Sequence, residues 1–135
     1  PLGKIGLCIC YDLFFPEVCR LTRLKGAQLI VVISASPAIR KSFFEVLTAA
    51  RALENTAFLA YVNLAGVEEG LQFWGGSRLV SPTGDVLAKA KYDKEDFVIC
   101  EVDYSDMRPA ETFIPTIRDL RPELFAELKE YSENF

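Results

Sequence analysis

Histidine is absent from this sequence of 135 residues. A Cys–His pair is therefore excluded as a catalytic centre, because the chain has no imidazole to act as the base. This rules out the papain and caspase patterns of cysteine protease. Any nucleophile in this chain must exchange its proton with a carboxylate or an amine.

Positive charge and long apolar runs are also scarce. Lys and Arg number 15 against 19 Asp and Glu, which gives a net charge of −4 and a pI near 4.9. Such a chain offers no basic surface for DNA or RNA. Its longest apolar stretches, such as 29–33 and 57–61, are far shorter than the roughly 20 residues of a membrane helix. We therefore expect neither a nucleic-acid partner nor a membrane span.

Cysteine occurs only four times, at positions 8, 10, 19 and 100. In a chain this hydrophobic, four cysteines do not suggest a disulfide framework, and a reducing, cytoplasmic location fits better. Cys8 and Cys10 form a C-x-C pair with no second pair and no histidine to complete a zinc site. We expect no metal and no cofactor.

The first half of the chain alternates between strand and helix patterns. Strands are predicted at 3–10, 28–33 and 56–64, and helices at 16–25 and 42–54. The run QLIVVI at 28–33 is typical of a strand buried on both faces of a parallel sheet. Ser42 and Glu45 have the spacing of a capping box at the start of the second helix.

The second half has a different pattern. Residues 65–76 hold four of the eight glycines and are expected to be irregular, and short strands at 77–80 and 86–89 flank a turn at 81–85. One more strand is predicted at 97–103. We divide this single domain, 1–135, into a folded part at 1–106 and a tail at 107–135. The tail ends in a short helix at 122–131, and its apolar residues need a partner such as a second subunit.

Cys10 is the candidate nucleophile, because it lies where the first strand meets Tyr11 and the helix that opens at Pro16. A thiol on such a turn is displayed at the end of the sheet, next to backbone amides that favour a thiolate. Cys8 and Cys100 are interpreted as core residues inside strands, and Cys19 as an ordinary helix residue. We therefore expect Cys10 to be the most reactive thiol.

Several neighbouring residues have two interpretations. Asp12 and Glu17 are acid–base groups or, as the spacing favours, a turn residue and a carboxylate near a helix N-terminus. Ser34 and Ser36 follow a buried strand at the edge where open α/β sheets bind ligands, so they line a pocket or cap a loop.

Five segments resemble the nitrilase superfamily of carbon–nitrogen hydrolases. GLCICYDLFFPE at 6–17 resembles the family's cysteine motif, and RALEN at 51–55 resembles its helix signature. Tyr61-Val-Asn63, then Gly-Gly-Ser at 75–77 with Pro82 and Gly84, and finally DLRPE at 119–123 resemble later landmarks in the same order. The match spans nearly the whole chain and corresponds to the C-terminal half of the family.

The resemblance implies an α/β fold: part of an α-β-β-α sandwich, with a mixed sheet, helices on one face and a C-terminal dimerisation tail. It implies Cys10 as nucleophile and the Tyr11 backbone N–H as an oxyanion donor, with Ser34, Ala35 and Ser36 on the substrate side. The substrate would be a small amide or nitrile, and the protein a homodimer or larger oligomer.

In the resembled family a glutamate base and a lysine precede the cysteine motif, whereas only nine residues precede Cys10. We therefore expect this chain to carry one of three catalytic residues, to need an N-terminal half and to be inactive alone. The alternative is a non-catalytic interaction module with the same fold. A redox protein using Cys8 and Cys10 ranks last, because a disulfide between residues i and i+2 of a strand is strained.

Overall fold

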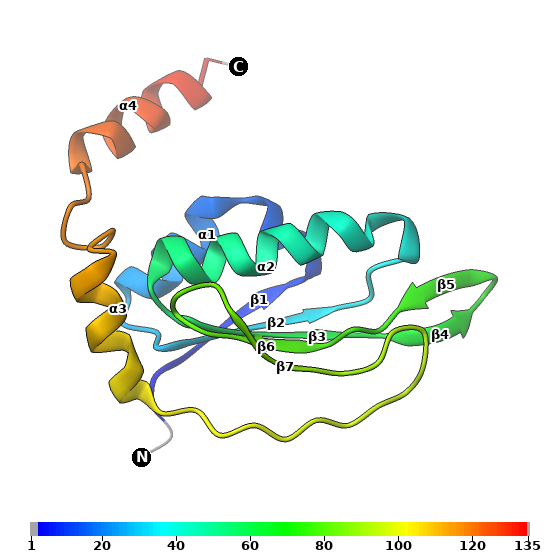
Figure 1. Cartoon of the computed structure of the whole chain (residues 1–135). Helices are drawn as coiled ribbons and strands as arrows, with labels where there is room; N and C mark the ends of the chain where they lie inside the picture. Colours follow the sequence, from blue (N-terminus) through cyan, green and yellow to red (C-terminus); the bar gives the residue numbers. More distant parts are fainter. Residues whose placement is uncertain (1–2, 135) are drawn as a thin grey trace.

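The computed structural model describes residues 3–134, which form a five-stranded mixed sheet with helices on one face (Figure 1). The strands, in order across the sheet, are β1 (Ile5–Ile9), β2 (Leu29–Ser34), β3 (Phe58–Asn63), β6 (Arg78–Val80) and β7 (Val86–Lys89). The first three are parallel to one another, and β6 and β7 are antiparallel to their neighbours. The predicted mixed α/β sheet is confirmed.

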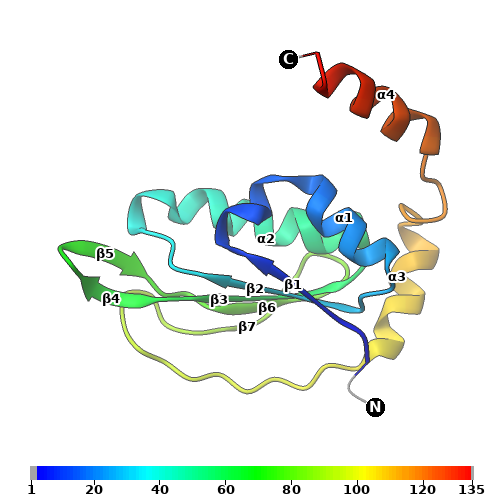
Figure 2. The same ribbon diagram turned by 180° about the vertical axis from the view of Figure 1, so that it is seen from behind.

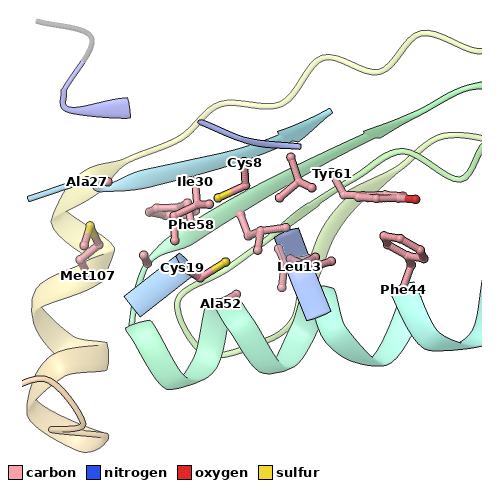
Figure 3. Packing of buried hydrophobic residues seen from close by; sticks show 14 of the residues in the cluster. Cys8, Leu13, Cys19, Ala27, Ile30, Phe44, Ala52, Phe58, Tyr61 and Met107 are labelled. Atoms are coloured by element: carbon pink, nitrogen blue, oxygen red, sulfur yellow. The ribbon is translucent and has the colours of Figure 1, made fainter. Parts of the chain in front are cut away.

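Helices α1 (Pro16–Leu24) and α2 (Lys41–Asn55) pack on the same face of this sheet and enclose the core (Figure 3). Proline at the first position of α1 suits a helix start, because its missing N–H would have no partner there. Strand β1 and helix α1 approach closely at Gly6, where a Cβ atom would lie 2.0 Å from Thr22 Cγ2. Only glycine allows this contact.

Residues 65–76, expected to be irregular, instead form a hairpin of β4 (Ala65–Glu68) and β5 (Leu71–Trp74), which projects beyond the main sheet (Figure 1). The two residues between the strands, Glu69 and Gly70, have φ values of +49° and +81°. A two-residue loop with positive φ at both positions matches the twist of an antiparallel hairpin. The glycines therefore shape a hairpin turn and its base.

The predicted capping box of α2 is wrong. The helix begins at Lys41, its N-cap is Arg40, and no side chain caps it. Glu45 is held elsewhere, because its Oε1 accepts hydrogen bonds from Tyr92 Oη at 2.5 Å and from Arg78 Nη2 at 3.1 Å.

The strand predicted at 97–103 is also wrong. This segment runs beneath the sheet in Figure 1, on the side opposite the helices, and no strand within residues 3–134 pairs with it. A hollow of about 420 Å³ separates it from β2, β3 and β6. Cys100, expected in the core, is consequently exposed.

The sheet face opposite the helices is apolar and largely open. Adjacent strands place Leu7, Val31 and Ala60 in one row, and Ile9, Ile33 and Val62 in the next. Leu7 is 71% exposed and Ile33 is 49% exposed. β2 is therefore buried on one face only, not on both as predicted. An apolar face of this size is typical of an interface.

The tail begins with η3 (Tyr104–Asp106) and α3 (Met107–Phe113), which dock on the folded part. Met107 and Ala110 are buried, and Glu111 forms an ion pair with Arg23 of α1. The final helix, α4 (Pro122–Ser132), lies apart from the body in two opposite views (Figures 1 and 2), and all its residues are exposed. Within residues 3–134, no helix has the length and apolar character that crossing a membrane requires.

We predict that the chain self-associates through α4, because Phe125 and Leu128 are apolar and exposed. Light scattering at micromolar concentration should show a dimer or larger species. Replacing both residues with serine should weaken association at least tenfold, since two large apolar side chains contribute about 1.5–3 kcal/mol each when buried. Replacing the neighbouring Lys129 with serine is the matched control. A monodisperse wild-type monomer would contradict the prediction.

Candidate active site

Cys10 is the first residue after β1 and begins the 3-10 turn η1 (Cys10–Phe14). Its φ of +42° lies in the left-handed region, which residues other than glycine rarely occupy. Its side chain is partly buried against the core. Strained residues of this kind persist where the surrounding structure holds them, and they cluster at active sites. The strand-to-helix turn predicted for Cys10 is confirmed.

Asp12 stabilises this turn through both its side chain and its backbone carbonyl. The Ile9 N–H donates to Asp12 Oδ2 at 2.9 Å, and the Phe15 N–H donates to the Asp12 carbonyl at 3.1 Å. Asp12 therefore has the structural role that its spacing favoured. Glu17 is exposed in the first turn of α1.

Arg51 of α2 holds the same turn from outside. Its buried side chain donates from Nε to the Leu13 carbonyl at 2.9 Å and from Nη2 to the Phe14 carbonyl at 3.4 Å, while Nη1 pairs with Glu54 at 3.1 Å. Charged hydrogen bonds to buried carbonyls are stronger than neutral ones. Arg51, the first residue of the RALEN segment at 51–55, thus fixes the turn that carries Cys10.

The register of the parallel strands places three polar positions in one row. Ile9 lies beside Ile33, so Cys10 follows β1 at the level of Ser34, and Ser34 lies beside Asn63. The row runs along the carboxyl edge of the sheet, where open α/β sheets bind ligands.

Tyr61 lies under this row. Its hydroxyl is 3.3 Å from Ser34 Oγ, and its ring stacks on Trp74 with centroids 5.5 Å apart. Burial raises the pKa of Tyr61 to about 12, and the nearby Cys10 adds to the rise. The hydroxyl therefore stays protonated and can donate a hydrogen bond at neutral pH.

Asn63 connects the site's loops. Its Oδ1 accepts from the Ser36 N–H at 2.8 Å, and its Nδ2 donates to the Ser36 carbonyl at 3.4 Å and to the Gly75 carbonyl at 3.2 Å. Ser36 is fully buried, and its Oγ has no hydrogen-bond partner within residues 3–134, whereas Ala35 is exposed. The structure thus brings Ser34 and Ser36 to the edge that carries Cys10.

Glu45 belongs to a neighbouring network rather than to this row. Burial opposes its ionisation, but hydrogen bonds from Tyr92 and Arg78 lower the pKa of Glu45 below its ordinary value. The ammonium group of Lys41 lies 3.5 Å from the Tyr92 ring centroid. Among residues 3–134, no three Cys, Asp or Glu side chains cluster as metal ligands.

The sequence prediction missed the roles of Tyr61 and Asn63. Both are polar residues in the apolar run TAFLAYVNL, and both are buried. A polar residue at the carboxyl end of a buried strand needs a partner, which is a usable signal. The contacts of Arg51 with the Leu13 and Phe14 carbonyls could not be foreseen, because these two acceptors lie nearly forty residues away in the chain.

The family model described as carbon-nitrogen hydrolase matches residues 1–112. The chain is 35% identical over 127 residues to a probable nitrilase of Schizosaccharomyces pombe, covering 93% of this chain and 47% of that protein. It is 34% identical to a 2-oxoglutaramate amidase of Paenarthrobacter nicotinovorans, covering 90% of this chain and 41% of that one. The chain therefore spans less than half the length of these relatives.

Solved structures match in the same way. A carbon-nitrogen hydrolase from Helicobacter pylori G27 superposes with a TM-score of 0.88 at 30% identity, covering 94% of this chain and 49% of that one. A glutamate-to-glutamine mutant of an amidase from Nesterenkonia sp. AN1 superposes with a TM-score of 0.79 at 34% identity, covering 93% of this chain and 44% of that one. That structure shows the acetamide moiety of fluoroacetamide added covalently at the active-site cysteine.

We predict that folding accelerates alkylation of Cys10. If the left-handed turn displays the Cys10 sulfur for attack, as proposed for a nucleophile, iodoacetamide should label Cys10 several-fold faster in the folded chain than in urea, measured by peptide mapping. Exposed Cys100 should change little, and buried Cys8 and Cys19 should slow down. Slower labelling of Cys10 in the folded chain would count against its assignment.

A second prediction concerns pH. Because folding raises the pKa of Tyr61 to about 12 from about 10, the unfolded chain loses the Tyr61 proton first as pH rises. Stability contributed by this group is present below pH 10 and is lost above it. Between pH 9 and 11 the free energy of unfolding should fall by about 1 kcal/mol more in wild type than in Tyr61→Phe, measured by urea titration. Equal slopes would contradict the prediction.

Proposed function

The chain belongs to the carbon–nitrogen hydrolase family, and from this premise we propose that it carries the nucleophile of an amidase-type site. Cys10 attacks the carbon of a small, non-peptide amide or nitrile and forms a thioester. The observation that carries the proposal is the left-handed conformation of Cys10 on a clamped turn at the carboxyl edge of the sheet. Covalent addition at the active-site cysteine of the related amidase supports it.

The proposed reaction on an amide has two stages. A carboxylate takes the Cys10 proton, and the sulfur bonds to the carbonyl carbon as the oxygen becomes an oxyanion. The oxyanion then collapses, the C–N bond breaks, and the nitrogen leaves with that proton as ammonia or an amine. Water hydrolyses the thioester, releases the acid and returns the proton to sulfur. The Tyr11 N–H is the proposed oxyanion donor, and each such donor is worth about 3 kcal/mol.

We place the substrate between Cys10 and the loop of Ser34, Ala35 and Ser36. The free Oγ of buried Ser36 and the protonated hydroxyl of Tyr61 are polar groups at this edge. The amidase relatives support an amide substrate, and several are 2-oxoglutaramate amidases or omega-amidases. 2-Oxoglutaramate is therefore the first substrate to test, with a nitrile as the comparison.

A glutamate base and a lysine for the oxyanion are proposed to come from protein outside residues 1–135. Asp12 is bound to the turn and Glu45 to Arg78 and Tyr92, so these two carboxylates are already engaged. In the related amidase, the glutamate replaced in the covalent-adduct mutants precedes the cysteine replaced in another mutant. The open apolar face of the sheet is a surface that such an upstream half would cover.

A second candidate function is a non-catalytic interaction module. The open sheet face and the exposed apolar residues of α4 favour it, because both surfaces suit protein partners. The two candidates differ in one respect: only the hydrolase needs Cys10 for turnover.

We predict that the 135-residue chain alone does not hydrolyse 2-oxoglutaramate or a nitrile measurably, since base and lysine are supplied from elsewhere. Adding an N-terminal half from a related amidase, with its glutamate and lysine, should restore ammonia release. Cys10→Ala in the same mixture is the control and should abolish it, whereas Cys100→Ser should not. If the isolated chain hydrolyses the substrate and this activity requires Cys10, the proposal that the base and the lysine come from outside residues 1–135 is overturned. Failure of restoration, with a formed complex, would favour the interaction module.

A further inference from the structure

A buried tyrosine lies beneath the loop on which the proposed reaction depends. Tyr61 belongs to β3, and its side chain is fully buried. Figure 3 shows its ring beside Phe44, between the sheet and α2, with the hydroxyl directed toward the carboxyl ends of the strands. This hydroxyl donates a hydrogen bond to Ser34 Oγ at 3.3 Å. A polar group thus reaches from the core to the edge that carries Cys10.

Aromatic packing fixes the position of the Tyr61 hydroxyl. The centroid of the Tyr61 ring lies 5.3 Å from that of Phe44 and 5.5 Å from that of Trp74. On the Trp74 ring, in turn, lies the guanidinium group of Arg78, 5.3 Å from the centroid. A buried ring with such neighbours has little room to turn, because protein interiors are close-packed. The hydroxyl is therefore held in place before any substrate arrives.

The direction of the hydrogen bond decides what Ser34 can do. A serine hydroxyl has one proton to donate and two lone pairs that accept. Tyr61 occupies one lone pair, because burial raises the pKa of Tyr61 to about 12 and the phenol keeps its proton at neutral pH. The structure gives Ser34 Oγ no other hydrogen-bond partner within residues 3–134. The serine proton is therefore left to be donated to another molecule.

Ser34 is placed to donate this proton at the carboxyl edge. It is partly exposed, and the tyrosine from which it accepts lies beneath it in the core. Its backbone is fixed as well, because its carbonyl accepts from the Leu64 N–H at 3.0 Å. The strand register places it between the end of β1, where Cys10 begins the turn, and Asn63 of β3.

We propose that Tyr61 is a positioning residue, which holds the Ser34 hydroxyl as a donor to the carbonyl oxygen of the substrate that Cys10 attacks. Ser34 touches the substrate, and Tyr61 acts through Ser34. The inference rests on the proposed function, because it assigns to that reaction a second oxyanion donor beside the Tyr11 N–H. Negative charge grows on this oxygen as the sulfur bonds to the carbon, and a donor already in position stabilises that charge.

Acylation of Cys10 in the 135-residue chain tests the proposal without an N-terminal half. The probe is p-nitrophenyl acetate: the Cys10 thiolate attacks its carbonyl carbon, the oxygen becomes an oxyanion, and the C–O bond breaks to release nitrophenolate. This leaving group needs no added proton. Methyl methanethiosulfonate is the comparison reagent, because it modifies a thiolate and has no carbonyl oxygen. All chains carry Cys100→Ser, and the rate at Cys10 is measured by peptide mapping.

Tyr61→Phe and Ser34→Ala should each slow the acylation of Cys10 about three- to tenfold, the effect of losing one hydrogen bond. Neither should change the rate with methyl methanethiosulfonate. The double variant should be no slower than Ser34→Ala alone, since Tyr61 acts through Ser34. Ser34→Thr keeps the hydroxyl and should keep the rate. Tyr92→Phe is the matched control, because it removes a phenol that binds Glu45 instead of Ser34, and both rates should stay unchanged.

Two results would overturn the positioning role alone. One is an unchanged rate of acylation in Tyr61→Phe, and the other is an equal slowing with both reagents, which indicates a general disturbance of the Cys10 turn. Failure of the proposed function gives a different result. Folding of the parent chain would then favour acylation of Cys10 no more than it favours the reaction with methyl methanethiosulfonate, compared with the same chain in urea, and both proposals would be overturned.

Discussion

The parallel register of β1, β2 and β3 is the constraint on which the candidate site depends. Pairing Ile9 with Ile33 and Ser34 with Asn63 brings the ends of three strands to one level. A slip of one residue would move every side chain of a strand to the opposite face of the sheet. The register therefore decides at once which residues enter the core, which form the open face and which meet at the carboxyl edge.

Polar contacts then turn this edge into a defined site. Arg51 binds the carbonyls of Leu13 and Phe14, and Asn63 joins the Ser36 loop to Gly75. A buried polar group left without its partner costs about 1–3 kcal/mol, so these contacts hold the loops in one arrangement. They also offset the strain of Cys10, whose backbone conformation would not persist on a free turn. The contacts that stabilise this turn therefore also hold the candidate nucleophile in place.

Much of this architecture follows from local patterns in the sequence. The apolar runs, together with Pro16 and the hairpin turn at 81–85, predicted every strand of the main sheet and both of its helices within a few residues. Cys10 was identified by its place between a strand and a helix start, and Ser34 and Ser36 by theirs after a buried strand. The predictions of the strands and helices succeeded because strand alternation, helix starts and tight turns depend on neighbouring residues.

Predictions failed where the structure depends on contacts with residues that are distant in the sequence. The run at 97–103 has a strand's composition but no adjacent strand within residues 3–134, and Cys100 is exposed for that reason. The sequence by itself determined the strands, the helices and the nucleophile candidate. Only the tertiary structure decided which buried polar groups meet, because such contacts arise from packing between elements far apart in the chain.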